Sequence, residues 1–328
     1  MESKRKKVLI IGAGNIGSRH LQALKKVRLP LGIFVVDPKN ESLETARLRY
    51  DQVGRSKFEK SCIFLNDLDN LPSDIDLAII ATNSKIRKDV TKTLLSKSAV
   101  RFILFEKLLF QKKGDYFEIE ELLKKRNITS WVNCSMRTMP AYFLRKADIK
   151  KDDKVSLTVS GSQFGLITNS IHYIDYLSFL TDCDDFKIGT DLLDKKPFES
   201  KRKGFLELNG VLNIFFKNGS QGNFVCFGEG DAPIIVELIN SEFRLFSNET
   251  ERKAWIAKSP GWQPKLIKDG LLFQSEMTTQ VTTDILTKGK CNLTSFEKSS
   301  KLHLQFLDVL LKFLNTHSLK KYDSYPFT

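Results

Sequence analysis

The sequence contains no long hydrophobic run and no paired cysteines. None of its apolar stretches approaches the ~20 residues that cross a bilayer, so no transmembrane helix is expected. The five cysteines are odd in number and scattered without a C-x-x-C pair, which argues against a disulfide framework and a cysteine zinc site. These absences favour a protein of the reducing cytoplasm with no membrane partner.

Other common site types are also missing. No cluster of His, Asp and Glu has metal-ligand spacing, and no nucleophile elbow is present. The net charge is +13, but the basic residues are spread along the chain without a nucleic-acid module, so no nucleic-acid partner is expected. The charge leaves two explanations open, an acidic ligand such as a nucleotide-linked sugar or a property of the surface alone.

The first part of the chain carries a glycine motif. The apolar run Val8–Ile11 leads into G-x-G-x-x-G and then into an amphipathic helical pattern. In dinucleotide-binding units the first glycine permits a tight turn, the second leaves room for a pyrophosphate, and the third lets helix and strand pack closely. The helix N-terminus presents N–H groups to the phosphates. The expected cofactor-binding residues of this loop are Gly12, Gly14, Asn15, Ile16 and Gly17.

Asp37 ends the next apolar run, Gly32–Val36. It lies at the usual distance of about twenty residues from the glycine motif, where an acid accepts hydrogen bonds from the ribose hydroxyls of NAD. The same acid would repel the 2′-phosphate of NADP. NAD is therefore the expected cofactor, and NADP remains the alternative because Lys39 follows closely. A loop-capping role for Asp37 in another kind of α/β protein is the competing interpretation.

Strand and helix patterns alternate through residue 134, which predicts a doubly wound parallel sheet of the Rossmann type. The predicted strand at 75–81 is followed directly by the polar residues Thr82 and Asn83. Ligands bind at such carboxyl ends of parallel strands, so both residues are expected to contact the cofactor. The expected elements after Asp37 are a helix at 41–50, the strand at 75–81, a helix at 85–96, a strand at 100–105, a helix at 116–126 and a strand at 127–134.

The pattern changes from residue 154 onward, where short strand-like runs follow one another closely. Asn209-Gly210 and Asn218-Gly219 are strong hairpin signals between them. They predict a largely antiparallel sheet, closed by helices at 274–288 and 296–315. The expected fold class is therefore α/β, with an NAD(P)-binding Rossmann domain at 1–134 and an α+β substrate-binding and oligomerisation domain at 135–328.

Five segments of the chain resemble the Gfo/Idh/MocA family, the oxidoreductases related to glucose-fructose oxidoreductase and inositol dehydrogenase. The resemblance implies NAD(P)-dependent hydride transfer between nicotinamide and a hydroxyl or keto group of a sugar, cyclitol or nucleotide-linked sugar, with surface-polysaccharide synthesis as one setting. It also implies a homodimer or homotetramer formed through the sheet of the second domain. The segments occur in the family's order and spacing: Gly12–His20, Ile79–Asn83, Phe105–Leu108, Val132–Arg137 and Asn169–Asp175.

The resemblance assigns roles to Glu106 and Lys107. The family usually has Glu-Lys-Pro where this chain has Glu106-Lys107-Leu108. Lys107 is implied as the catalytic acid/base near the nicotinamide, and Glu106 as a contact of the nicotinamide ribose. Such a lysine needs a pKa lowered by burial or by the cationic nicotinamide, and a solvated loop lysine is the alternative. A trans bond before Leu108 is expected because cis bonds nearly always precede proline.

The second implied site lies on a helix predicted from residue 167 to 180. Thr168, His172 and Asp175 share one of its faces. Many family members have Asp-x-Gly-x-His here, whereas this chain has Thr168 at the aspartate position, Asn169 next to it, and the histidine retained. Asp175 is expected to be structural. A histidine satisfied in a polar interior is the alternative. The predicted catalytic residues are Lys107, His172, Asn169 and Thr168.

Three further expectations complete the sequence-based prediction. Arg137 follows a strand end and suits an anionic cofactor or substrate group, with an interdomain salt bridge as the alternative. His20 is expected to pack against the sheet. Two other functions remain open, a non-catalytic NAD-binding regulator and an enzyme that uses NAD in a redox-neutral reaction on a sugar.

Overall fold

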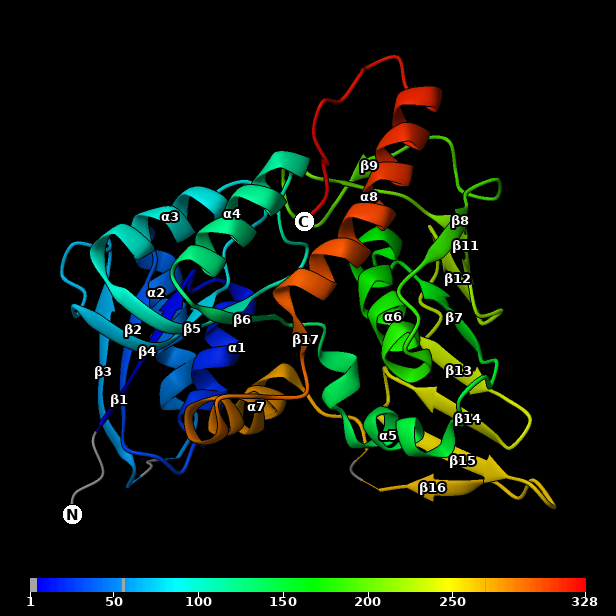
Figure 1. Ribbon diagram of the computed structural model, residues 1–328, viewed down its shortest axis with the longest axis horizontal. Coiled ribbons are helices and arrows are strands. Elements are labelled where there is room, and N and C mark those ends of the chain that lie inside the picture. The colour runs from blue at the N-terminus through cyan, green and yellow to red at the C-terminus, as the bar shows by residue number, and fades with distance from the viewer. Residues whose placement is uncertain (1–4, 55–56, 269) are drawn as a thin grey trace. The chain divides into compact units, whose positions relative to one another are not determined.

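The computed structural model describes residues 5–54, 57–268 and 270–328, and it divides the chain into two compact units (Figure 1). Unit 1 comprises Met1–Phe110, Gly114–Asn133 and Phe273–Glu297, and unit 2 comprises Gln111–Lys113, Cys134–Leu272 and Lys298–Thr328. The change from one unit to the other after Asn133 lies next to the predicted boundary. The prediction did not include the later segment of unit 1.

Unit 1 is built on a seven-stranded sheet with the order β17-β6-β5-β4-β1-β2-β3. Strands β1 to β6 pair in parallel, and β17 is antiparallel to β6. The predicted doubly wound sheet is thereby confirmed. Its strands are β1 (Lys6–Ile11), β2 (Leu31–Val36), β3 (Glu59–Leu65), β4 (Asp74–Ile80), β5 (Ala99–Phe105), β6 (Thr129–Val132) and β17 (Thr294–Ser295), and the helices are α1 (Asn15–Leu24), α2 (Asn40–Asp51), α3 (Arg87–Lys97), α4 (Lys113–Lys125) and α7 (Gln274–Lys288).

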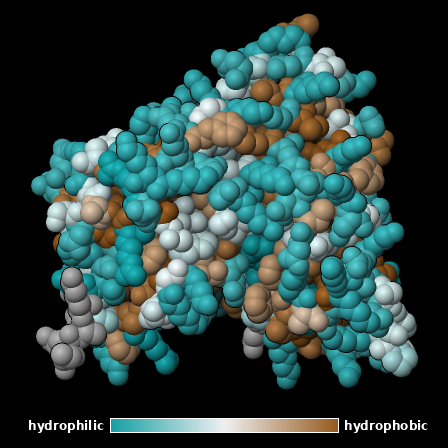
Figure 2. Space-filling model, in the orientation of Figure 1, coloured by the Kyte–Doolittle hydropathy of each residue, from teal (hydrophilic) through white to brown (hydrophobic). Residues whose placement is uncertain are grey.

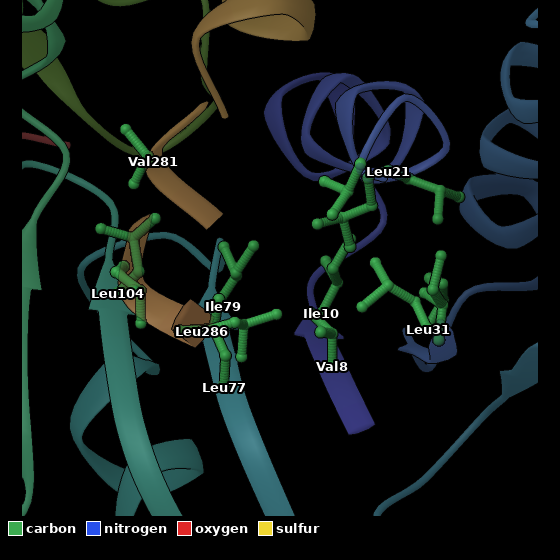
Figure 3. Close-up of a cluster of buried hydrophobic side chains, with 14 of the residues drawn as sticks. Val8, Ile10, Leu21, Leu31, Leu77, Ile79, Leu104, Val281 and Leu286 are labelled. Atoms are coloured by element: carbon green, nitrogen blue, oxygen red, sulfur yellow. The ribbon is translucent and has the colours of Figure 1, made fainter. Parts of the chain in front are cut away.

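The core of unit 1 lies between the sheet and the helices α1 and α7. Figure 3 shows side chains of β1, β4 and β5, such as Ile10, Ile79 and Leu104, beside Leu21 of α1 and the apolar residues of α7. Apolar runs are expected in strands that helices cover on both faces. Helix α7 comes from far along the chain, and its position in this core explains why unit 1 extends beyond residue 134.

Strand β3 is an element that the sequence did not reveal. It lies at the edge of the sheet and pairs in parallel with β2. Two charged residues and a serine precede Cys62, so the apolar part of β3 is confined to its last four residues, 62–65. Pairing with β2, rather than hydrophobic composition, identifies this strand.

Unit 2 contains an eight-stranded sheet with the order β16-β15-β14-β13-β7-β12-β11-β8. Only the pair β7 and β12 is parallel among the described ladders of this sheet, so the predicted antiparallel character is confirmed. Helix α6 (Leu166–Thr181) covers one face of this sheet (Figure 1). Its Tyr173 contacts Phe224 of β12. The remaining elements are β7 (Ser156–Ser162), β8 (Phe186–Gly189), β9 (Phe198–Glu199), β10 (Leu206–Glu207), β11 (Gly210–Phe216), β12 (Gln221–Phe227), β13 (Ile235–Ile239), β14 (Phe243–Asn248), β15 (Lys253–Lys258), β16 (Lys265–Ile267), α5 (Pro140–Phe143), α8 (Phe296–His317) and the 3-10 helices η1 (Ser135–Thr138) and η2 (Leu144–Asp148).

The two predicted hairpin turns have different outcomes. Asn218-Gly219 joins the antiparallel neighbours β11 and β12, with Gly219 at a positive φ of 87°, as predicted. The prediction for Asn209-Gly210 was wrong. β10 pairs with β9 in a separate two-stranded sheet and does not pair with β11. Gly210 has a φ of 102°, and the close approach of the Leu192 carbonyl oxygen leaves no room for a Cβ there.

The surface is mainly polar. Figure 2 shows hydrophilic side chains over most of the face in view, with apolar side chains scattered among them. Within the described ranges, no helix is both long enough and apolar enough to span a membrane.

Candidate functional site

The carboxyl ends of the central strands of unit 1 carry most of the predicted cofactor residues. Backbone bonds between neighbouring strands continue past the strand ends: Gly12 N–H donates to Val36 O at 2.8 Å, and Glu106 N–H donates to Ile80 O at 3.0 Å. The chain order reverses between β1 and β4, and open α/β sheets bind ligands at this point. Gly12, Asp37, Thr82, Asn83, Glu106 and Lys107 all follow ends of β1, β2, β4 or β5.

The three glycines of the loop meet different steric demands. Gly12 has a φ of 96°. A Cβ on Gly17 would lie 1.7 Å from Gly12 O, so only glycine fits at this position of α1, which packs against the backbone of the loop. A Cβ on Gly14 would meet nothing within 4 Å, and Gly14, Asn15 and Ile16 are at least partly exposed at the start of α1. The open space beside the N–H groups of this helix fits a pyrophosphate.

Asp37 lies where the ribose of a dinucleotide is expected. Its Oδ2 accepts a hydrogen bond from Ala13 N–H at 2.8 Å, and its Oδ1 accepts one from Lys39 N–H at 2.9 Å. A carboxylate has about four acceptor positions, so acceptor capacity remains for ribose hydroxyls. Asp37 therefore fixes the glycine loop and fits the cofactor as well.

Arg49 is a residue of this region that the sequence-based prediction missed. From α2 it donates to Ser18 Oγ at 2.6 Å and to Asn15 Oδ1 at 3.3 Å. These bonds hold the side chains of the first turn of α1. No motif marks this arginine, since its partners lie about thirty residues earlier in the chain.

Glu106 is the centre of a buried hydrogen-bonded network. Its Oε1 lies 2.8 Å from Nε2 of His20 and 2.6 Å from the Nδ2 of Asn133, which donates to it. The other ring nitrogen of His20 lies 2.7 Å from Oγ1 of Thr278 on α7, and the His20 side chain is fully buried. The prediction for His20 was only that it packs against the sheet. In the structure His20 also joins Glu106 to α7.

The charge of Glu106 is set by this network. Burial would raise the pKa of Glu106, but the hydrogen bonds and charge of His20, the hydrogen bond from Asn133 and the charge of Lys107 together bring it below its ordinary value. Glu106 is therefore a buried carboxylate that is held charged and fixed in position.

Lys107 follows Glu106 and is half-buried. The peptide bond between Lys107 and Leu108 is cis, so the expectation of a trans bond was wrong. The buried guanidinium of Arg87 donates to the carbonyl oxygens of Leu108 and Leu109, and also to Thr82 O. These hydrogen bonds from Arg87 hold the turn in place although it has no proline. The sequence pattern does not reveal them.

In unit 2, Thr168 and Asn169 lie in the first turn of α6. Thr168 Oγ1 donates to Thr328 O at 3.1 Å, and the Nδ2 of Asn169 donates to Phe164 O. The buried carboxylate of Glu207 accepts the N–H groups of Ile167 at 2.8 Å and Thr168 at 3.2 Å. Burial raises the pKa of Glu207 despite these bonds. A carboxylate is thus present beside Thr168, although it comes from β10 and not from α6.

His172 lies one turn farther along α6 and is half-buried, on the same face as Thr168. Asp175 is fully buried and pairs with Arg137, whose Nε lies 3.2 Å from Asp175 Oδ2. The guanidinium of Arg137 also lies over the ring of Phe179, 4.4 Å from its centre. Both partners belong to unit 2, so this ion pair is not an interdomain salt bridge, and Asp175 has the structural contact expected of it.

Comparison with known proteins identifies the fold independently. Residues 6–134 match the Gfo/Idh/MocA family model, described as an oxidoreductase family with an NAD-binding Rossmann fold. No curated protein is matched by this sequence.

Solved structures resemble the chain over nearly its whole length. A UDP-N-acetylglucosamine 3-dehydrogenase from Acidithiobacillus ferrooxidans is 14% identical, with a TM-score of 0.70 over 95% of this chain and 100% of that one. A biliverdin reductase from a Synechocystis species, solved with biliverdin and NADP+, is 15% identical, with a TM-score of 0.68 over 94% and 98%. An oxidoreductase from Agrobacterium radiobacter, solved with NAD+, L-tartaric acid and magnesium, is 15% identical, with a TM-score of 0.65 over 92% and 94%. Proteins with such different ligands share the fold, so the fold alone does not determine the substrate.

Proposed function

We propose that this chain, whose residues 6–134 match the Gfo/Idh/MocA oxidoreductase family model, oxidises or reduces a CH–OH or keto group of a sugar, cyclitol or nucleotide-linked sugar. NAD, when bound, supplies or takes the hydride. The observation that carries this proposal is the position of Lys107, which follows the fixed carboxylate of Glu106 at the carboxyl end of β5.

Lys107 is the proposed acid/base. Its side chain is half-buried at the carboxyl end of β5, where the proposal places the reacting hydroxyl of the substrate. Glu106 is the proposed contact of the nicotinamide ribose, and the network through His20 and Asn133 keeps its carboxylate in one orientation. Glu106 would then act on the cofactor, and Lys107 would act on the substrate.

His172 is the proposed partner of the substrate hydroxyls, together with Thr168 and Asn169 on the same helix. A histidine can donate or accept a hydrogen bond, which suits a hydroxyl that changes to a carbonyl. Arg137 is already paired with Asp175 and packed on an aromatic ring. Its proposed role is therefore to support α6 and not to contact the cofactor directly.

The decisive variant is Lys107→Ala. Loss of a positioned acid/base lowers turnover by about 10²- to 10⁴-fold, while NAD binding at the glycine loop persists. Turnover is followed as absorbance at 340 nm with a panel of sugars and nucleotide sugars, and NAD binding by thermal shift. Ser96→Ala on the exposed face of α3 is the matched control. Full turnover in Lys107→Ala would refute the mechanism.

The same experiment separates the alternatives. A non-catalytic NAD-binding regulator would show a thermal shift with NAD but no product with any substrate. A redox-neutral enzyme would form product with no net change at 340 nm. The presence of both Lys107 and His172 favours the dehydrogenase over the regulator.

The proposed assembly is a homodimer or homotetramer in the cytoplasm. The face of the unit 2 sheet opposite α6 carries a row of apolar side chains, Phe246, Trp255 and Leu266, on the adjacent strands β14, β15 and β16. Phe246 is 40% exposed and Leu266 is 54% exposed, so this row offers a surface for a second copy.

A further inference from the structure

Unit 2 contains an exposed cluster of positive charge in the segment 195–203. We call it the basic hairpin, because its residues lie before and between β9 and β10; they are Lys195, Lys196, Lys201, Arg202 and Lys203. All five are exposed. Glu199 is the only acidic residue among them, and its Oε1 accepts a hydrogen bond from Gly204 N–H at 2.9 Å.

The charge of the basic hairpin is not neutralised by the protein. Within the described parts of the chain, no acidic side chain forms an ion pair with the four lysines of the hairpin. Five neighbouring like charges repel one another, and an anion bound among them relieves that repulsion. Elsewhere in unit 2 several lysines do have acidic partners, such as Lys298 with Asp184 and Lys301 with Asp185.

The basic hairpin is attached to the helix that carries the proposed substrate residues. Arg202 Nη1 donates to Thr328 Oγ1 at 3.2 Å, and Thr328 O accepts the hydroxyl of Thr168 at 3.1 Å. The strand that follows the hairpin ends in Glu207, which accepts two N–H groups at the start of α6. These bonds link Arg202 of the hairpin, through Thr328, to Thr168 at the start of α6.

The N-terminus of α6 does not itself attract an anion, because Glu207 already occupies its first N–H groups. A negatively charged ligand at this end of the helix would therefore be bound by the basic hairpin. His172 lies four residues beyond Thr168, which is about 6 Å along the helix axis. A ligand whose charged group lies at the hairpin and whose hydroxyls reach His172 would extend along this part of α6. A sugar ring joined to the charged group has a suitable length.

From these contacts we infer that the basic hairpin binds the diphosphate of a nucleotide-linked sugar, whose sugar ring lies along Thr168, Asn169 and His172. This inference rests on the proposed function and narrows its substrate class. Lysines bind phosphate as mobile point charges, and a neutral sugar or cyclitol would leave all of them without a ligand. Part of the net positive charge of the chain would then serve to bind an acidic ligand, and the rest would be a general property of the surface.

The test measures binding of UDP and of inorganic pyrophosphate to the NAD-saturated protein by titration calorimetry. Saturation with NAD prevents either probe from occupying the glycine loop. The test variant is the double substitution Lys201→Glu and Lys203→Glu. The matched control is Lys217→Glu and Lys312→Glu, which changes the net charge equally at exposed lysines of unit 2 outside the hairpin.

We expect the parent protein and the control to bind both probes, and the hairpin variant to bind them at least about tenfold more weakly. Each additional tenfold corresponds to about 1.4 kcal/mol. Equal weakening in both double variants would show a general charge effect, and no binding to the parent would exclude the site; either result overturns the inference. Turnover of a neutral sugar with NAD in the parent would still support the dehydrogenase function. Absence of an NAD-induced thermal shift would instead contradict the function itself.

Discussion

At the residue scale, the proposed cofactor site of unit 1 is built from carboxylates that the fold itself holds in place. Asp37 holds Ala13 and Lys39 through their N–H groups, and Glu106 is held by His20 and Asn133. Each carboxylate is thereby fixed before any ligand arrives, so less ordering is needed on binding.

Asp37→Ala is expected to weaken NAD binding by about tenfold or more, because hydrogen bonds to a charged group contribute about 1.5–3 kcal/mol. It should also relax the discrimination against NADP, since the charge that opposes the 2′-phosphate is lost. Dissociation constants for both nucleotides are measured by fluorescence titration. Asp37→Asn is the control that keeps an acceptor oxygen but no charge. An unchanged ratio of the two constants in both variants would show that the ribose lies elsewhere.

His20→Ala is expected to lower the free energy of unfolding at pH 7 by about 1–3 kcal/mol, because it removes a buried partner of Glu106. The pKa of Glu106 lies below its ordinary 4.5, so the charged carboxylate stabilises the fold above that value, and this contribution is lost as the pH falls through the lowered pKa. The difference between parent and variant should therefore shrink in acid.

Urea unfolding at pH 7 and below pH 4 measures this difference for His20→Ala. Thr278→Val, which removes only the partner of the other ring nitrogen, serves as the control and should show a smaller loss at pH 7 with less dependence on pH. A difference for His20→Ala that is the same at both pH values would contradict the role given to the Glu106 charge. Turnover should also fall in His20→Ala, because Lys107 follows the carboxylate that has lost its support.

At the scale of elements, the turn from β1 into α1 shows how one loop combines packing with ligand space. Gly17 is in contact with the loop backbone, whereas Gly14 faces open space. The two glycines therefore meet different steric demands, although the sequence motif presents them together, and the proposed role of Gly14 is to leave room for the pyrophosphate.

Gly17→Ala is expected to reduce the free energy of unfolding by at least about 3 kcal/mol, the upper end for overpacking, because its Cβ would overlap Gly12 O. Gly14→Ala should change stability by only a few tenths of a kcal/mol but abolish the thermal shift with NAD. Gly114→Ala in α4, where a Cβ meets nothing within 4 Å, is the control and should be neutral or stabilising by up to about 1 kcal/mol. Retained NAD binding in Gly14→Ala would contradict the pyrophosphate position.

At the scale of the whole molecule, the proposed assembly surface is the face of the unit 2 sheet opposite α6. The row Phe246, Trp255 and Leu266 crosses three neighbouring strands, and the rings of Phe246 and Trp255 lie 5.9 Å apart. A few polar residues interrupt the apolar side chains, including the pair Glu237 and Arg244 at 2.7 Å. Mixed surfaces of this kind are common at interfaces between subunits.

We expect the parent protein to sediment as a dimer or tetramer and the double variant Phe246→Glu and Leu266→Glu to sediment as a monomer, because two charges would be buried unpaired in the interface. Sedimentation velocity measures the change. The control, Leu48→Glu and Leu319→Glu, adds the same charges at exposed leucines away from this sheet and should keep the parent's assembly. A monomeric parent, or a double variant that assembles like the parent, would refute this interface.

The sequence by itself determined the elements whose signals are local. The glycine loop, the apolar runs of β1, β2, β4 and β5, the buried stripe of α6 and the Asn218-Gly219 turn follow from periodicity and turn chemistry that neighbouring residues carry. It also placed Glu106 and Lys107 at the carboxyl end of a strand.

Only the tertiary structure decided the features that depend on contacts distant in sequence. Helix α7 completes the core of unit 1, His20 meets Glu106 and Thr278, Arg137 pairs with Asp175, and Glu207 brings a carboxylate to α6 where the family has an aspartate. β3 is identified as a strand by its parallel pairing with β2. β10 pairs with β9 and not with β11, although the turn signal Asn209-Gly210 follows β10. In each case the energy comes from burial or a hydrogen bond between segments that the chain brings together only on folding, and no local pattern records it.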